Sequence, residues 1–334
     1  MIKQLIYIAG IVVVLSSCFK EDDLLPAPTL QTTTIEMNKY YLYQSYFDLN
    51  TDTEVARNEK NDWDIGFESR DSSWHIVLNT SAFMYAANTG ETDFESVTDT
   101  TGLIWKFDKS DGNPDSTAVG NWLDIANDDT TYTNNVYVLN RGYDELGNLR
   151  GLRKVIFTHV DLDTYAFKYA DLNGENYNEF VVVKSDSINY AQFSFENGGK
   201  QVYFEPIYLT WDLLFTQYTT LLYTDEGDPY PYLVTGVLTN YNRVEVALDS
   251  ILDFENIDLN YAMGLDFSKN QDAIGYDWKE LKGDVNSGNV YYEIVEGRNY
   301  IIKNRFGLYT KFRFISFYNS GGDKGYPTFQ YLFL

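Results

Sequence analysis

The sequence predicts an antiparallel all-β protein, and three observations lead to this class. Short runs of β-branched and aromatic residues recur along the chain, as in 40–43, 136–139 and 312–315. Segments 164–169 and 190–195 alternate with a period of two, which is typical of half-buried strands. Residues that favour tight turns separate such runs at 173–174, 197–199 and 320–323. Long stretches with helical periodicity are nearly absent, so we expect antiparallel sheets throughout.

Charge and length exclude some functions. The chain has 334 residues, with 49 acidic residues against 25 basic ones and a formal net charge of −24. Nucleic-acid binding is disfavoured, because it requires a surplus of Lys and Arg that releases counterions from phosphates. The length allows one large domain or two smaller ones.

Residues 1–17 have the pattern of a bacterial lipoprotein signal peptide. Lys3 precedes an apolar run, 5–15, that is too short to span a bilayer as a helix. Small residues then stand directly before Cys18, an arrangement that resembles the lipobox. We expect removal of the signal peptide and acylation of Cys18, which would anchor the chain to a membrane without a transmembrane helix. The alternative is a buried cysteine behind an uncleaved signal anchor. Since Cys18 is the only cysteine, no intrachain disulfide can form.

Residues 18–32 predict a lipidated acidic linker. The run Lys20-Glu21-Asp22-Asp23 is followed by a Pro-containing stretch, which favours an extended tether. The acidic run also resembles the signal with which Bacteroidota send lipoproteins to the outer face of the outer membrane. A solvated linker without a signal role is the alternative. We therefore expect a lipid-anchored, outward-facing protein of the outer membrane.

An internal repeat predicts two related β modules. Residues Trp63 to Phe67 recur as Trp211 to Phe215, and each unit is followed by a strand, a Gly-centred turn and two further strands. The matching strands are 137–141, 153–157 and 165–169 in the first copy and 300–304, 310–314 and 328–332 in the second copy. The predicted boundaries are 33–172 for the first module, 173–205 for connecting strands and 206–334 for the second module. Chance recurrence of common β-strand residues is the alternative.

The Trp-Asp-x-x-Phe unit has a structural interpretation. Residues four apart lie on the same face of a strand, so Trp63 and Phe67 are expected to anchor one face together. The pair Trp211 and Phe215 is expected to do the same. Asp64 and its equivalent would then lie on the opposite face, free to cap a turn or meet a cation.

The repeated units and the C-terminal strands resemble the HmuY family of Bacteroidota lipoproteins. The motifs that carry this resemblance are 63–67, 211–215, 274–278, 300–303 and 325–329. The resemblance implies an all-β fold of two sandwich-like HmuY-type modules. It also implies a hemophore role, in which heme is captured outside the cell and passed to an outer-membrane receptor. Heme-binding members hold the iron with two axial His or two axial Met side chains between the Trp-Asp strand and the Tyr-Ile-Ile-Lys strand.

Two methionines are candidate axial ligands within the window that this resemblance defines. Met263 lies between the small residues Ala262 and Gly264, which would let a flat ring approach its thioether. Met84 is the candidate in the first copy, and a methionine that fills a core gap is the alternative for both. His75 is expected to be an exposed or hydrogen-bonded strand residue. His159 is expected in the core, because alternation places it on the same face as Phe157.

Two acidic segments, 48–54 and 171–175, carry oxygen ligands of the kind that calcium prefers. Neither fits the EF-hand pattern, because Gly174 is the fourth residue of its segment instead of the sixth. We expect both to be hairpin turns on a solvated surface, with a calcium site as the alternative.

The sequence predicts a binding protein and no enzyme. It lacks HExxH, GxSxG, P-loop and GxGxxG motifs. The expected ligand is heme or a related porphyrin, bound without covalent chemistry. A glycan-binding or structural surface lipoprotein of the same fold is the alternative, because exposed Tyr and Trp with Asp and Asn suit sugar rings. A hydrolase with paired carboxylates is a third possibility, although no spacing points to one.

Overall fold

The computed structural model describes residues 28–70, 72–126, 129–241, 243–284 and 288–334. The predicted signal peptide 1–17, the lipidation site Cys18 and most of the linker lie outside the described residues. The described chain folds almost entirely into antiparallel strands, which confirms the all-β class. Helical residues are confined to short turns, such as α2 (Leu259–Ala262).

The first module is a sandwich of two sheets. Its five-stranded sheet has the order β12 (Asn178–Val183), β11 (Thr164–Ala170), β10 (Leu152–Val160), β9 (Tyr137–Asn140) and β6 (Tyr85–Asn88). Its four-stranded sheet has the order β14 (Lys200–Val202), β13 (Tyr190–Ser194), β4 (Ile65–Glu68) and β5 (Ile76–Leu78). A short hairpin of β7 (Leu123–Ala126) and β8 (Asp129–Tyr132) accompanies them.

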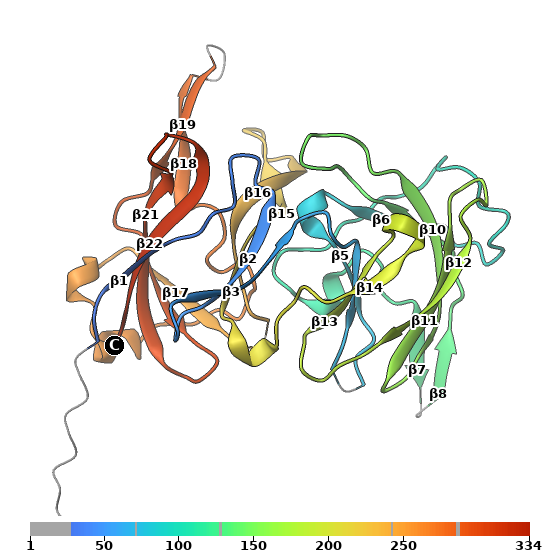
Figure 1. Cartoon of the computed structure of the whole chain (residues 1–334), viewed down its shortest axis with the longest axis horizontal. Coiled ribbons are helices and arrows are strands. Elements are labelled where there is room, and N and C mark those ends of the chain that lie inside the picture. Colours follow the sequence, from blue (N-terminus) through green and yellow to red (C-terminus); the bar gives the residue numbers. More distant parts are fainter. Residues whose placement is uncertain (1–27, 71, 127–128, 242, 285–287) are drawn as a thin grey trace, which may run out of the picture.

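The second module repeats this architecture. Its five-stranded sheet has the order β1 (Gln31–Thr34), β22 (Lys324–Phe333), β21 (Tyr309–Tyr318), β20 (Asn299–Lys303) and β17 (Glu245–Asp249). Its four-stranded sheet has the order β16 (Pro229–Thr239), β15 (Leu213–Tyr223), β2 (Tyr43–Asp48) and β3 (Thr53–Glu59). A longer hairpin of β18 (Lys279–Asp284) and β19 (Asn289–Ile294) projects from this module (Figure 1).

The two strand orders match when the four-stranded sheet of the second module is read from β3 to β16, which confirms two related modules. In this match β1, β2 and β3 of the second module correspond to β12, β13 and β14 of the first. The second module is therefore a circularly permuted copy. Its N-terminal strands β1 and β2 pair with β22 and β15, which follow the first module in the sequence, and β3 extends the sheet beside β2.

Sheet membership consequently differs from the predicted boundaries. Residues 33–59, expected in the first module, belong to the second, and the expected connecting segment 173–205 carries β12, β13 and β14. Alternation of apolar residues indicates that a segment is a strand, but it does not indicate which strand it pairs with.

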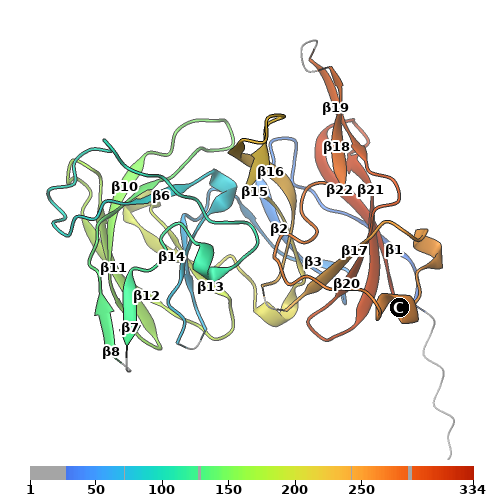
Figure 2. The ribbon, with the colours of Figure 1, turned by 180° about the vertical axis from the view of Figure 1, so that it is seen from behind.

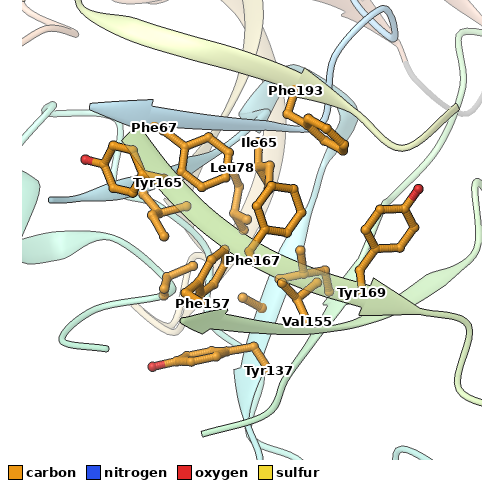
Figure 3. Close-up of a cluster of buried hydrophobic side chains, with 14 of the residues drawn as sticks. Ile65, Phe67, Leu78, Tyr137, Val155, Phe157, Tyr165, Phe167, Tyr169 and Phe193 are labelled. Carbon is orange, nitrogen blue, oxygen red and sulfur yellow. The ribbon is translucent and has the colours of Figure 1, made fainter. Parts of the chain in front are cut away.

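Each module encloses an aromatic core between its two sheets. In the first module Phe67 of β4 packs against Phe167 of β11, and Phe167 meets Phe193 of β13 edge to face at 5.0 Å (Figure 3). In the second module Phe215 stacks on Phe329 at 5.3 Å. These rings are fully buried, so most of the apolar surface that stabilises each module lies between its own two sheets.

The four sheets form consecutive layers along the long axis of the molecule, with the four-stranded sheets at the centre (Figures 1 and 2). The contact between these two central sheets is here called the seam. Polar side chains cross it: Trp63 Nε1 donates to Gln44 Oε1 at 2.9 Å, and Asn189 Nδ2 donates to Asn240 Oδ1 at 3.0 Å. Thr219 Oγ1 also donates to the backbone carbonyl of Thr80 across the seam, at 2.8 Å.

The expectation that Trp and Phe of each Trp-Asp unit share one face is wrong. Phe67 and Phe215 lie in the module cores, whereas Trp63 and Trp211 lie at the seam. The strands begin only at Ile65 and Leu213, so the tryptophans precede the regular alternation on which the expectation depended.

The expectation of a core position for His159 is also wrong. A bulge between Phe157 and His159 shifts the register of β10 against β11. An extra residue of this kind reverses the alternation beyond it. The His159 side chain is therefore half exposed and pairs with Asp161 at 3.1 Å.

Candidate functional site

The larger described cavity lies beside the projecting hairpin of the second module and is here called the hairpin cavity. Its volume is about 620 Å³. Three segments form its walls: the chain before β2, the strands β18 and β19, and the turn between β21 and β22. The lining residues are mostly aromatic or basic, namely Lys39, Tyr40, Leu281, Val290, Tyr291, Tyr292, Tyr318, Gly322, Asp323 and Lys324.

Four of the residues that line this cavity are tyrosines. Tyr40 and Tyr291 are exposed, so their rings and phenol oxygens are open to a ligand. Tyr292 and Tyr318 are partly buried, and the backbone N–H of Tyr292 donates to Tyr318 Oη at 2.6 Å. Burial, together with Tyr232 and Tyr318 nearby, raises the pKa of Tyr292, so this phenol stays protonated near neutral pH.

The charge balance of the hairpin cavity is opposite to that of the chain. Two ammonium groups, from Lys39 and Lys324, stand against the single carboxylate of Asp323. Both lysines are exposed, and the Lys39 Nζ atom lies 5.4 Å from the centroid of the Tyr40 ring. In a chain with a net charge of −24, this local excess of positive charge favours an anionic ligand.

Neither predicted methionine ligand lines the hairpin cavity. Met84 is 0% exposed and belongs to the core of the first module, in keeping with the gap-filling alternative. Met263 is 61% exposed and lies directly after α2 in the second module. The structure does not bring the two thioethers together, since each belongs to a different module and neither lies on the wall of either described cavity.

His75 is hydrogen-bonded, as the sequence predicts. Its Nδ1 atom lies 2.6 Å from Glu68 Oε2, and its ring stacks on Trp74 with centroids 4.2 Å apart. The ring is therefore already held by the first module and does not line the hairpin cavity.

The two acidic segments lie at β-hairpin turns, as the sequence predicts. However, Asp48 is buried instead of solvated, because Arg305 Nη2 donates to its Oδ1 atom at 2.9 Å. Arg153 pairs with Asp171 in the other turn. Among the described residues, no group of three His, Cys, Asp or Glu side chains is arranged to hold a metal ion. In the same part of the chain, no helix has the length and apolar character required to cross a membrane.

Comparison with known proteins gives the family. The family model for HmuY protein matches residues 40–331, which is most of the chain. The chain therefore belongs to the HmuY family. A search of curated proteins found no match.

Solved structures with detectable similarity include proteins from Tannerella and Bacteroides species. The apo HmuY analog of Tannerella forsythia is 13% identical over 93% of this chain and 98% of its own, with a TM-score of 0.21. A candidate HmuY-like heme-binding protein from Bacteroides vulgatus is 15% identical over 54% of this chain and 91% of its own, with a TM-score of 0.18. A candidate lipoprotein from Bacteroides fragilis is 16% identical over 54% of this chain and 88% of its own, with a TM-score of 0.18.

The tyrosines of the hairpin cavity were not singled out by sequence reasoning. Two adjacent pairs, Tyr40-Tyr41 and Tyr291-Tyr292, are visible in the sequence, but 29 tyrosines are spread along the chain. Only the tertiary structure brings residues from positions 39–40, 281–292 and 318–324 to one cavity.

Proposed function

We propose that this protein binds heme or a related porphyrin non-covalently in the hairpin cavity. Membership of the HmuY family supports a heme-related role. The single observation that carries the assignment to this cavity is a tyrosine-lined hollow with two lysines, Lys39 and Lys324, in a strongly acidic chain.

The volume and the lining residues of the hairpin cavity suit a porphyrin. Its volume of about 620 Å³ falls within the roughly 300–1,000 Å³ of typical ligand pockets. Aromatic and aliphatic side chains can cover a flat macrocycle, and Tyr291, Tyr40 and Val290 are available at its walls. The two ammonium groups match the two propionates of heme, which would remain near water.

A phenol oxygen is the candidate iron ligand in this cavity. The lining residues include no histidine or methionine, whereas tyrosine is an established ligand of heme iron. Tyr40 and Tyr291 are the exposed candidates. Met263 lies in another part of the second module. Because its thioether is exposed, it serves as the comparison residue in tests of the iron ligand.

We further propose that the protein is anchored by lipid at Cys18 on the outer face of the outer membrane and delivers its cargo to an outer-membrane receptor. Replacement of Cys18 by Ser should abolish incorporation of labelled fatty acid into the chain in cells that process lipoproteins. Surface protease treatment of intact cells then tests its orientation. Equal incorporation of labelled fatty acid into the wild-type and Cys18→Ser chains would contradict lipid anchoring at this residue.

The test of heme binding is a titration of the soluble chain from about residue 24 onward with hemin. A saturable shift of the Soret band with one equivalent bound is expected. Iron-free protoporphyrin in a parallel titration separates the contribution of the cavity from that of the iron ligand. Absence of any spectral change, together with retention on a polysaccharide column, would instead support a glycan-binding protein of the same fold.

A further inference from the structure

A second, smaller cavity lies at the seam between the two modules and is here called the seam cavity. Its volume is about 120 Å³. Strands of both central sheets and the loop at residues 108–117 line it. This loop crosses from the first module to the second: Ser110 Oγ donates to Asp272 Oδ2 at 2.5 Å, and the Gln271 N–H donates to the Asp111 carbonyl at 2.8 Å.

The seam cavity is built from equivalent positions of the two copies. Trp63 and Trp211 occupy the same place in the repeated unit, and both line it. Gln192 of β13 and Tyr46 of β2 are also equivalent, because each pairs with the second residue of the strand after the Trp-Asp unit. The hollow therefore results from the way the two modules pack, and neither module alone encloses it.

The size of the seam cavity suits one six-membered ring. A cavity of roughly 150 Å³ holds a benzene molecule, and one water needs roughly 10–15 Å³ of such volume. At about 120 Å³, the seam cavity is somewhat smaller than the cavity that holds benzene, with room for on the order of ten waters or for a single ring that it encloses in part. It is far too small for a porphyrin, so it is distinct from the hairpin cavity.

Two side chains that line the seam cavity each have a buried polar atom without a hydrogen-bond partner among the described residues. These atoms are the indole Nε1 of Trp211, which is a donor, and the Oδ1 atom of Asn189, which is an acceptor. The two side chains belong to residues that are 2% and 3% exposed. Burial of unpaired polar atoms is costly, and a hydroxyl group can satisfy both atoms because it accepts and donates.

The carboxylates on the wall are already satisfied by the protein, so they do not favour a cation. Asp108 accepts the backbone N–H of Leu78 at 2.6 Å and that of Ala118 at 2.7 Å. Glu205 accepts N–H groups from Asn189 and Tyr190. The remaining charged residue of the lining, Lys109, is exposed, so the buried part of the cavity favours a neutral ligand.

We propose that the seam cavity binds a neutral polyhydroxylated six-membered ring, that is, a free monosaccharide or a single sugar unit of a glycan. The indole and phenol rings can stack on the apolar face of a sugar, while the amides and the two unpaired atoms meet its hydroxyl groups. This site is independent of the hairpin cavity, so the failure of either proposal leaves the other intact.

The experiment is a calorimetric or ligand-observed NMR titration of the soluble chain with glucose, galactose, mannose, fucose, xylose and N-acetylglucosamine. Saturable binding of at least one of these sugars is expected. Leu214→Trp should abolish it, because Leu214 lines the seam cavity and the larger ring would fill the space. Leu221→Trp is the matched control on the same strand β15, since Leu221 is exposed and does not line the cavity.

Trp211→Phe is a second variant, which keeps an aromatic ring but removes the indole N–H. Loss of one hydrogen bond of about 1.4 kcal/mol corresponds to about a tenfold fall in affinity. If circular dichroism shows that Leu214→Trp does not fold, the affinity of Trp211→Phe for the sugar still tests the proposal. Binding of none of the six sugars, or binding that both Leu214→Trp and Trp211→Phe leave unchanged, would overturn the proposal.

Discussion

Arg141 donates two hydrogen bonds to Asp64, from Nε at 3.0 Å and from Nη2 at 3.1 Å, and both side chains are almost completely buried. Asp64 also accepts the N–H of Phe195 at 2.7 Å, so the pair joins the start of β4 to the end of β13. The second module repeats this arrangement: Arg305 lies 2.7 Å from Asp212, which accepts the N–H of Leu49. The Asp of each repeated unit therefore meets a cation, which is one of the two roles that the sequence left open for it.

Replacement of Asp64 by Ala should strongly destabilise the protein. It leaves the Arg141 guanidinium buried without its main partner, and loss of one member of a buried pair costs about 3–5 kcal/mol. Urea denaturation with linear extrapolation measures this loss. Glu280→Ala, which breaks an exposed pair with Lys282, is the control and should cost less than about 1 kcal/mol. Equal losses in free energy of unfolding for both variants would show that the buried pair contributes no more stability than an exposed pair.

Replacement of Gly142 by Ala should cost more than replacement of Gly147 by Ala. Both glycines have positive φ, +68° and +85°, so the backbone penalty of alanine is similar at the two positions. A Cβ atom on Gly142 would lie 1.8 Å from the carbonyl oxygen of Ala82, whereas one on Gly147 meets nothing within 4 Å. The difference isolates the steric contact and should be about 1–3 kcal/mol in free energy of unfolding. Closely similar melting temperatures for the two variants would contradict this packing.

Stability should fall as the pH rises from about 5 to 8, because of two carboxyl groups at the seam. Burial raises the pKa of Asp108 and of Glu205 to about 7, well above their values in an unfolded chain. Between the unfolded and folded values the native state binds more protons, so the free energy of unfolding decreases with pH and levels off above the folded pKa.

The Asp108→Asn/Glu205→Gln double variant cannot titrate at these positions and should therefore show a flatter pH profile. Chemical denaturation at intervals between pH 5 and 8 gives both profiles. Parallel profiles for the wild type and the double variant would exclude these carboxyls as the source of the slope.

The Lys39→Ala/Lys324→Ala double variant should bind hemin at least tenfold more weakly than the wild type. It removes both ammonium groups of the hairpin cavity, and a hydrogen bond to a charged group contributes about 1.5–3 kcal/mol. Hemin titration measures the affinity. The matched control is Lys200→Ala/Lys269→Ala, which makes the same charge change at exposed residues outside this cavity. An equal loss in both double variants would indicate a general charge effect.

The exposed tyrosines test how the iron is held. If Tyr40 or Tyr291 provides the phenol ligand, the corresponding change to Phe should alter the Soret band of the hemin complex and leave iron-free protoporphyrin binding nearly unchanged. Met263→Ala is the comparison, because the exposed thioether lies outside the hairpin cavity. A spectrum that changes in Met263→Ala but in neither tyrosine variant would place the porphyrin at another site.

By itself the sequence determined the fold class and the duplication. Local alternation, turn residues and the repeat of Trp63 to Phe67 at Trp211 to Phe215 depend on short segments, and the structure confirms two related β modules. The tertiary structure alone decided that β1 to β3 complete the second module, that a bulge turns His159 outward, and that both cavities exist. The physical reason is that strand partners, register shifts and the packing of two sheets depend on contacts between residues far apart in the chain, which no local pattern records.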